Sequence, residues 1–519
     1  MSTALAKVKK QLVWGLSQLE PATLGRVLAS SSSSAAAASS IPNSDKILRQ
    51  VDDAALLIVR AMNGPWRFFH TVDHVFDVGG VEDPAEVLAG LYHDLVYVQI
   101  DMGMSFTMSN LLSPYIEEIV EGIDVPNTST SAAPGVASLR VRPRSTLPKG
   151  DLIIELVLGI FGFQPGQVLS PFGGQNEFLS ALVATIVLQP LLGYTHLVHI
   201  VACIEATIPF RPNDKVTGRT PTESLHAHLV ETNQSCGLGL SAGNIEQAVR
   251  RAVRLANRDV ANFAYTNSAT FLDNTWRLLP ETNHGLRNAS SYTVREFRVS
   301  VQKMEGFLTF LQPEVIFSRF QDEPSGDTFE ENTGRARHNL EVSRLYLGCK
   351  LAALAIMETI SYRLGMDVPL SMLTGDLPRV GYEHVPQLAD FLPDPTVGQT
   401  QSAVSDADES PLHAKLGVNP LADLSELEQE VLCLLEFGRA RDSSYDRRNS
   451  PLATFLVKRL GFAKTTAILA RCKVFFSGKL EAEALLAELD PFVVESVQTA
   501  IVSILKAYQA ILCHPLVRS

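Results

Sequence analysis

The sequence contains few cysteines, and none of them is paired at close spacing. Six cysteines occur in 519 residues, without a C-x-x-C motif. Disulfide frameworks and cysteine-based zinc sites are both built from regularly spaced cysteines. We therefore expect reduced thiols in the core of a cytoplasmic protein. The cysteines are Cys203, Cys236, Cys349, Cys433, Cys472 and Cys513.

An excess of positive charge is also missing. The chain has 44 Lys and Arg against 56 Asp and Glu, which gives a formal net charge of −12. Long nucleic acids are bound mainly through clustered positive charge, so we expect no such partner. A local basic pocket for a small phosphate compound is compatible with this balance. With 46% hydrophobic and 19% charged residues, the chain is typical of a globular protein, and it is long enough for two or three domains.

No apolar run is free enough of polar residues for a membrane span. The stretch 181–208 has the necessary length, but it is interrupted by Gln189, Pro190, His196, His199 and Glu205. Charged and imidazole groups are costly in lipid. We therefore predict a buried helical hairpin that is broken at Gln189-Pro190, and no membrane span. Membrane association is the alternative, and only this stretch supports it.

We expect no secretory signal peptide in the first residues of the sequence. The run QLVWGLSQLEP (11–21) is too short and too polar for the apolar core of such a peptide. The Ser/Ala-rich, mostly non-acidic segment that follows leaves an organelle transit peptide open as the alternative to a cytoplasmic location.

Strand-like alternation is absent as well, whereas apolar residues recur at helical spacing along most of the chain. We therefore predict an all-α fold. Shifts in composition predict a flexible N-terminal segment (1–43), a helical domain (44–330) with an inserted loop (124–150), a helical extension (331–385), an acidic linker (386–411) and a C-terminal helical region (412–519). The last region carries no chemistry-bearing cluster, and it fits a partner-binding or homo-oligomerisation role.

Two histidines and a His-Asp pair stand close together in the stretch 66–97. His70 and His74 are four residues apart, so they share one face if the segment is helical. Asp83-Pro84 is a helix start signal, and the helix that it begins places His93-Asp94 near its C-terminal end. Adjacent helical residues diverge by about 100°. Both can still bind one ion if that ion lies beyond the helix end.

A carboxylate far along the chain completes the cluster. Asp259 falls on the apolar face of a helix predicted over 244–265, three residues after Ala256. A carboxylate buried there needs a cationic partner or a metal. Neutral imidazoles with carboxylates suit divalent Mn, Fe, Mg or Zn centres that keep open positions.

Secondary candidates have ordinary interpretations beside the functional ones. Arg211, Lys215 and Arg219 either neutralise a substrate phosphate or belong to a solvated turn. Glu177 and Glu205 either orient ligand imidazoles or are satisfied acids without a role in a site. His196 and His199 are interpreted as core histidines.

The histidine-bearing segments resemble the HD-domain metal-dependent phosphohydrolases, with a more distant similarity to cyclic-nucleotide phosphodiesterases. The matching motifs span roughly residues 44–310 and end near Arg295-Glu296-Phe297. They are FFHTVDHVFDV (68–78), LAGLYHDLVY (88–97), QNEFLSA (175–181), IEATIPF (204–210) and RDVANF (258–263). Two positions depart from the family pattern: Phe69 replaces the usual Tyr, and Phe210 stands where related sequences often carry a His.

The resemblance implies an HD-type helical bundle whose metal ligands are His74, His93, Asp94 and Asp259. It implies His70 as the general acid that protonates the leaving oxygen. Asp94 would hold the attacking water, or bridge two metals if two bind. Phe210 in place of a His favours one metal over two.

We therefore expect a metal-dependent phosphohydrolase that acts on a phosphomonoester or phosphodiester, such as a nucleotide. Arg211 and Lys215 are its expected phosphate-binding residues. The alternative is a helical interaction or regulatory protein whose HD site is degenerate or holds metal only for structure.

Overall fold

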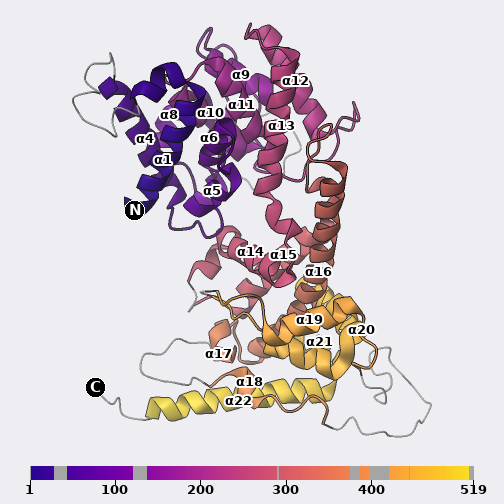
Figure 1. Ribbon diagram of the computed structural model, residues 1–519. Coiled ribbons are helices and arrows are strands. Elements are labelled where there is room, and N and C mark those ends of the chain that lie inside the picture. The colour runs from indigo at the N-terminus through magenta and orange to yellow at the C-terminus, as the bar shows by residue number, and fades with distance from the viewer. Residues whose placement is uncertain are drawn as a thin grey trace. The chain divides into compact units, whose positions relative to one another are not determined.

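The computed structural model describes residues 2–27, 44–120, 137–288, 291–374, 386–397, 420–443 and 445–513. Helices dominate these residues, and the strands among them form one two-stranded sheet, so the fold is all-α (Figure 1). The predicted linker at 28–43, the first part of the predicted insertion (124–136) and residues 398–411 of the predicted acidic linker lie outside the described residues.

The chain divides into two compact units. The first contains residues 1–264 and 312–334, and the second contains residues 265–311 and 335–519. This division differs from the predicted domain 44–330, because 265–311 belong with the C-terminal part. Long-range hydrogen bonds explain the difference. The Trp276 indole donates to Asp446 over 2.9 Å, and the Asn339 amide donates to the Tyr265 carbonyl over 2.8 Å.

The first unit is a bundle of helices. Its main helices are α1 (Ser2–Leu19), α4 (Ser44–Met62), α5 (Val72–Gly79), α6 (Pro84–Tyr92), α7 (Val98–Asp101), α8 (Phe106–Leu112), α9 (Leu152–Phe161), α10 (Gln175–Leu188), α11 (Tyr194–Ala206), α12 (Pro221–Ser235) and α13 (Ala242–Asp259). The long helix α16 (Gly326–Arg363) begins in the first unit and continues in the second.

Helix α11 lies at the centre of this unit. It packs against α6, α9, α10, α12 and α13, and its residues from Leu197 to Ala206 are all buried. Helix α10 ends at Leu188, so the chain breaks between α10 and α11 where Gln189-Pro190 predicts it. No helix in the described part of the chain is both long and apolar enough to cross a membrane.

Helix α1 is part of the core, although the sequence predicts a flexible segment over 1–43. Val8, Leu12 and Leu16 recur at intervals of four residues and are at most 1% exposed. They pack toward α4 and α6. The apolar spacing at i and i+4 explains the helix, and the Ser/Ala-rich composition that dominates the segment lies after it.

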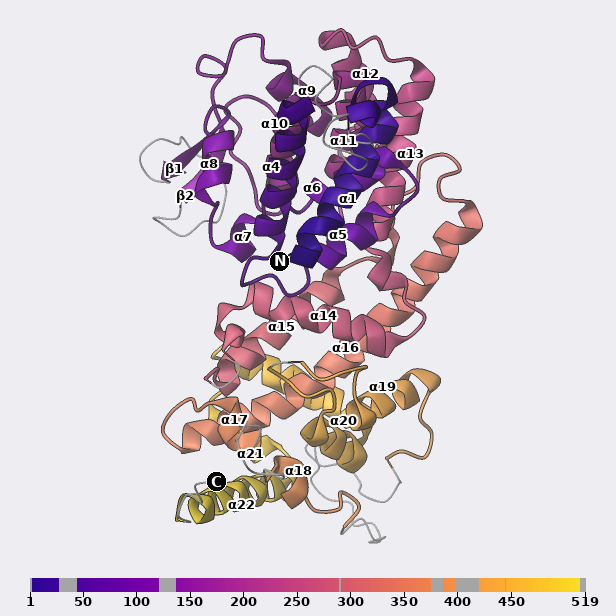
Figure 2. The same cartoon turned by 60° about the vertical axis from the view of Figure 1, so that its left-hand side comes forward.

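A short hairpin replaces part of the predicted insertion. Strand β1 (Ile116–Val120) pairs antiparallel with β2 (Ala137–Val141), and both can be followed in Figure 2. Glu117 lies opposite Arg140, and the two side chains form an ion pair at 2.6 Å. Each strand is only five residues long, too short for alternation to be distinguished from a helical pattern in the sequence.

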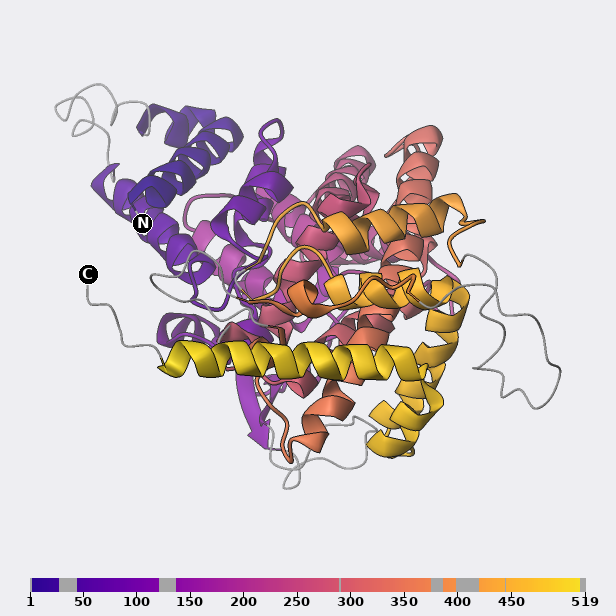
Figure 3. The ribbon, with the colours of Figure 1, turned by 90° about the horizontal axis from the view of Figure 1, so that it is seen from below.

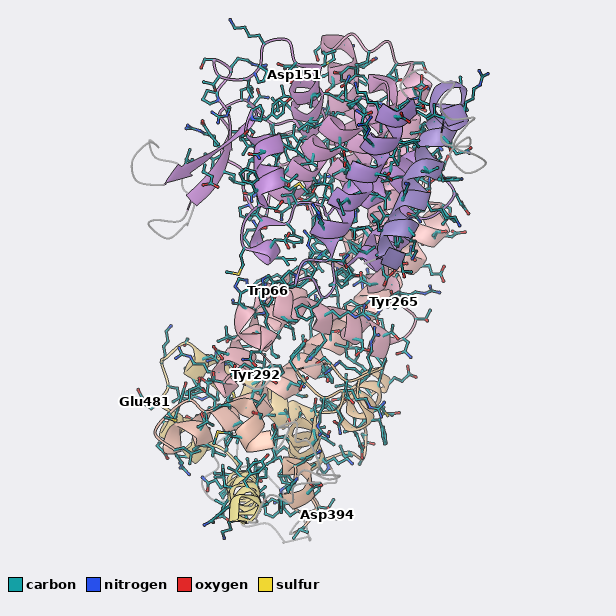
Figure 4. All side chains as sticks on the ribbon, turned by 90° about the vertical axis from the view of Figure 1, so that its left-hand side faces the viewer. Trp66, Asp151, Tyr265, Tyr292, Asp394 and Glu481 are labelled. Carbon is teal, nitrogen blue, oxygen red and sulfur yellow. The ribbon has the colours of Figure 1, made fainter. Side chains whose placement is uncertain are left out.

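The hairpin and the next helix are connected by a hydrogen bond. Asp151 (labelled in Figure 4) caps the N-terminus of α9 by accepting a hydrogen bond from the Ile153 backbone. Its second carboxylate oxygen accepts a hydrogen bond from the Tyr115 hydroxyl at 2.6 Å. Of the predicted insertion, residues 137–141 form strand β2, and residues 142–150 are turns and coil.

The second unit is also helical. It contains α14 (Ser268–Thr282), α15 (Val294–Phe310), most of α16, α17 (Leu370–Thr374), α18 (Leu388–Phe391), α19 (Glu426–Phe437), α20 (Pro451–Phe476), α21 (Ala482–Glu488) and α22 (Pro491–Cys513). Helix α18 falls within the predicted acidic linker. Helix α22 is one long unbroken helix (Figure 3). Helix α20 is kinked at Gly461, whose φ of 77° favours glycine.

Candidate metal centre

Helix α5 carries His74 but not His70. Thr71 is the N-cap residue, and the helix begins at Val72, so His70 lies in the bend before it. The prediction that His70 and His74 share one face of a helix is therefore wrong. The two rings are nevertheless 5.6 Å apart, in an edge-to-face arrangement. The His70 ring also lies 4.8 Å from the ring of Tyr97.

Helix α6 begins and ends as its sequence predicts. Asp83 accepts hydrogen bonds from the Ala85 and Glu86 backbone, and Pro84 occupies the first helical position. His93 is the C-cap residue, and its Nδ1 lies 2.8 Å from the Gly90 carbonyl oxygen. Nδ1 must therefore carry the proton in the neutral ring, because a carbonyl only accepts. This leaves the Nε2 lone pair for a metal.

Two glycines bring these helices together. A Cβ added at Gly90 would lie 2.3 Å from the Gly79 Cα and 2.5 Å from the Gly79 nitrogen. Only glycine permits this contact between α5 and α6. The close crossing places His74 and His93 within reach of each other, with ring centroids 5.4 Å apart.

Four predicted ligands converge. His93 Nε2 lies 3.0 Å and His74 Nε2 lies 3.4 Å from Asp94 Oδ2. Asp259, the last residue of α13, places its Oδ1 at 3.1 Å from His74 Nε2 and at 3.7 Å from His93 Nε2. The ligand atoms of His74, His93 and Asp94 all lie within 4.8 Å of one another.

Three of these atoms lack the geometry of a hydrogen bond. His74 Nε2, His93 Nε2 and Asp94 Oδ2 are buried, and none has a hydrogen-bond partner despite the short distances between them. Buried polar atoms are almost always paired, because an unpaired one costs about 1–3 kcal/mol. Two imidazole nitrogens and a carboxylate oxygen that point at one position fit a divalent cation.

The histidines and the carboxylates at this candidate metal centre shift each other's pKa values. Burial alone lowers the pKa of His74, but the carboxylates of Asp259 and Asp94 outweigh it and raise this pKa to about 9. The pKa of His93 is likewise raised well above its ordinary value, against the effect of burial. Burial raises the carboxyl pKa values, but the histidines lower that of Asp259 to about 2 and that of Asp94 well below its usual range.

Residues outside the predicted set hold the ligands in place. The Arg67 guanidinium donates to the Asp94 carbonyl over 2.7 Å, and it is fixed by Asp101 at 2.6 Å. Arg258 donates to the Val78 carbonyl over 2.6 Å and to Glu86 over 2.7 Å. These contacts fix the positions of Asp94 and of the end of α13. No sequence pattern indicates these supporting arginine contacts, since the two partners of a contact are 27 to 180 residues apart.

A cavity of about 150 Å³ opens beside Asp259. Arg211 lines it, and its guanidinium binds Glu205 at 2.5 and 3.2 Å while Nε is buried without a partner. Lys215 is exposed and does not line this cavity. Phe210 lines the cavity with a positive φ of 55°. Of the two expected phosphate-binding residues, Arg211 alone is therefore at the cavity.

The secondary acids have different surroundings. Glu205 is 2% exposed, and its carboxylate is occupied by Arg211, so it orients no imidazole. Glu177 lies in the first turn of α10. Burial raises the Glu177 pKa to about 7, and Asp94 and Asp259 contribute in the same direction.

Comparison with other proteins adds nothing to this geometry, since no protein-family model, curated protein or solved structure matches the chain.

Proposed function

We propose that the chain is an HD-type metal-dependent phosphohydrolase, with His74, His93, Asp94 and Asp259 as ligands of a divalent cation. The observation that carries this proposal is the convergence of three buried atoms without hydrogen-bond partners. A structural hydrogen-bond network would have satisfied these atoms. Mn, Fe, Mg and Zn all accept such a donor set.

The bound cation would lower the pKa of a coordinated water and polarise a phosphoryl oxygen. The chain's own residues have separate roles in the proposal. His93, fixed by Gly90, presents Nε2. Asp94 orients the attacking water. His70, which contacts the His74 ring from outside α5, donates the proton to the leaving oxygen.

The substrate in this proposal is a small phosphomonoester or phosphodiester, such as a nucleotide. The cavity beside Asp259 supports it, because Arg211 lines this cavity and contributes a positive charge to its wall. Phe210 also lines the cavity and contacts the Phe263 ring edge to face at 5.5 Å, so part of the wall is apolar. A cytoplasmic location belongs to the same proposal, since the five cysteines whose side chains are described are free thiols.

The proposal is tested by metal analysis and by turnover. We expect purified protein to carry about one divalent ion per chain, and to hydrolyse members of a panel of phosphomonoesters and phosphodiesters. His74→Ala and Asp94→Ala should lose both the ion and turnover. His338→Ala is the matched control, because His338 is exposed and pairs with Glu430 in the second unit.

The outcomes separate the proposal from its alternative. Wild-type metal content in His74→Ala and Asp94→Ala would overturn the site. Bound metal with no turnover of any phosphate ester would overturn the enzyme and favour a structural centre. Loss of turnover in His70→Ala with metal retained would support the general-acid role.

A further inference from the structure

Three serines of the chain follow closely spaced arginines. Each has an arginine three residues before it and a second arginine two to five residues before it. The segments are RVRPRS, which ends at Ser145, RARDSS, which ends at Ser444, and RRNS, which ends at Ser450. Protein kinases select serines partly by the charges around them, and carboxylates bind guanidinium groups strongly. A kinase with an acidic substrate groove therefore accepts this pattern, and the fold decides which of the three serines it can reach.

Burial excludes two of these patterns. Ser450 is 8% exposed, and its hydroxyl accepts a hydrogen bond from Lys350 Nζ over 3.1 Å. The pattern before Ser444 includes Arg439, which is 2% exposed. Ser444 itself lies outside the described residues. A kinase cannot read either pattern unless part of the second unit unfolds.

Ser145, in contrast, lies in an exposed turn of the first unit. The Thr146 backbone donates to the Pro143 carbonyl over 2.9 Å, so Arg144 and Ser145 are the central residues of a β-turn. Both are exposed. The Thr146 hydroxyl donates to the same carbonyl over 3.0 Å, whereas the Ser145 hydroxyl has no hydrogen-bond partner among the described residues. The Ser145 hydroxyl is therefore accessible to an enzyme.

The arginines before Ser145 are accessible as well. Arg140 belongs to strand β2 and Arg142 follows it directly, so their side chains lie on one face, opposite to the buried Val141. The side chains of Arg140, Arg142 and Arg144 are 25%, 32% and 61% exposed. The serine and the arginine pattern before it are thus presented together.

Ion pairs with nearby acids do not prevent recognition of these arginines. Glu117 lies 2.6 Å from Arg140 and 3.3 Å from Arg142, so one carboxylate is shared by two guanidinium groups. Arg144 pairs with Glu155. All of these side chains are at least 21% exposed. Exposed ion pairs contribute little to stability, and the carboxylates of a kinase groove can therefore replace the two glutamates.

The turn must also open, because kinases bind the substrate segment in an extended form. Within the turn, the backbone groups of Thr146 and Leu147 donate to the Pro143 carbonyl over 2.9 and 3.2 Å. Residues 137–141 are already extended in strand β2. Exposed segments with few hydrogen bonds open at low free energy. The segment 140–146 can therefore enter a kinase groove while the helical bundle stays folded.

We propose that Ser145 is a phosphorylation site for an arginine-directed protein kinase. Ser145 Oγ attacks the γ-phosphorus of ATP, and a new O–P bond forms as the bond from this phosphorus to the β,γ-bridging oxygen breaks. ADP leaves, and the hydroxyl proton passes to the catalytic aspartate of the kinase. The product adds nearly two negative charges to a turn that follows three arginines. The proposal is independent of any activity at the metal centre.

The test uses folded full-length protein, radiolabelled ATP and purified protein kinase B, which selects arginine at three and five residues before the serine. Mass spectrometry locates the phosphate. We expect it at Ser145, and at neither Ser444 nor Ser450. Ser145→Ala should remove the label and keep the wild-type unfolding midpoint, since the side chain is exposed. Thr146→Ala is the matched control and should keep the label, because Thr146 is an exposed neighbour with a different arginine spacing.

Arginine variants test the recognition. Arg142→Gln should lower kcat/KM of the kinase for the protein roughly tenfold or more, because charge-assisted hydrogen bonds are lost. Arg140→Gln should lower it to a smaller extent. Arg448→Gln should leave it unchanged, because Arg448 is an exposed arginine before the buried Ser450.

The absence of label on the folded protein would overturn the proposal. So would label that persists in Ser145→Ala, or an unchanged kcat/KM in Arg142→Gln. Phosphate that appears at Ser450 as fast as at Ser145 would show that exposure does not select the site, and it would overturn the proposal equally.

Discussion

At the scale of single residues, two glycines matter as much to the metal centre as the ligands do. Gly79 and Gly90 let α5 and α6 touch, and no side chain fits between them. The ligands His74 and His93 are carried on these two helices. Their separation is therefore set by backbone contact, which no list of polar residues would reveal.

Gly90→Ala should weaken metal binding although it changes none of the ligand residues. Its Cβ would meet the Gly79 Cα at 2.3 Å, so α5 and α6 must move apart at a cost of about 1–3 kcal/mol. We expect weaker metal binding in calorimetry and a lower unfolding midpoint. Gly334→Ala is the control, because nothing lies within 4 Å of its added Cβ inside α16. It should stabilise by about 0.5–1 kcal/mol. Equal effects of the two substitutions would contradict this account.

His199 gives the first unit a dependence on acid. It is 7% exposed, and its Nδ1 lies 3.1 Å from the Arg251 guanidinium. Burial, together with the charge of Arg251, lowers its pKa to about 4, although Asp83 opposes this. Between about pH 6.5 and pH 4, His199 is therefore protonated in the unfolded chain but neutral in the folded chain.

His199 therefore does not reduce the free energy of unfolding above pH 6.5, and it reduces this free energy progressively as the pH falls toward 4. The loss is on the order of 3 kcal/mol, from a pKa change of about 2.5 units. In His199→Gln, this part of the pH dependence should vanish from denaturant titrations at pH 7, 5.5 and 4.5. His226→Gln should keep it, and a wild-type slope in His199→Gln would show that other groups cause the acid sensitivity.

Of the residues at the centre, the sequence predicts those with metal-ligand chemistry. Residue type, spacing and helix signals predict a cluster of His70, His74, His93, Asp94 and Asp259, and the family resemblance implies the last four as the ligands. The structure brings these four together. Arg67, Glu86 and Arg258 were not found. Arginine-carboxylate contacts between distant segments leave no periodic pattern, and only the folded chain brings the partners together.

At the scale of elements, the centre depends on how α13 is attached to α5 and α6. Glu86 is 3% exposed and accepts hydrogen bonds from Arg254 and Arg258 at 2.5 and 2.7 Å. Arg251 adds an ion pair to Asp83 at 2.7 Å. One face of α13 is thus fixed to the start of α6 by charge pairs, and its last residue is Asp259.

Glu86→Gln should loosen this attachment. Removing one partner of a buried ion pair typically costs about 3–5 kcal/mol, and here two arginines lose their charged acceptor. We expect reduced stability and weaker metal binding. Glu82→Gln, which changes an exposed acid four residues away, should alter neither. Wild-type metal affinity in Glu86→Gln would show that the position of Asp259 does not depend on this attachment.

The sequence predicts long amphipathic helices well and short elements poorly. The start of α6 and the break between α10 and α11 were predicted, because Pro and N-cap residues have strong local preferences. The hairpin of β1 and β2 was missed, since five-residue strands carry too few positions for alternation. The spacing of His70 and His74 predicts one helix for both, whereas the N-cap at Thr71 leaves His70 outside it.

At the scale of the whole molecule, the proposed metal centre belongs to the first of the two units. Bound metal should therefore stabilise that unit first. Metal at a hundred times its dissociation constant should add about 2.7 kcal/mol to the unfolding free energy. Hydrogen exchange should show protection of α5, α6 and α13 with metal.

Asp94→Ala is the control for this effect. The variant should remove the metal-dependent protection of these helices. Metal-dependent protection that persists in Asp94→Ala would place the cation elsewhere in the chain.

The burial of α1 against α4 and α6 has a consequence for synthesis of the chain. Translation adds roughly 5–20 residues per second, and 73 residues separate the end of α1 at Leu19 from the end of α6 at Tyr92. The apolar face of α1 therefore lacks α6 for roughly 4–15 seconds, although α4 is synthesised earlier. During that interval the nascent chain offers Val8, Leu12 and Leu16 to cellular chaperones. Ribosome-bound chains that end between α1 and α6 should be captured by chaperones more often than chains long enough to expose α6.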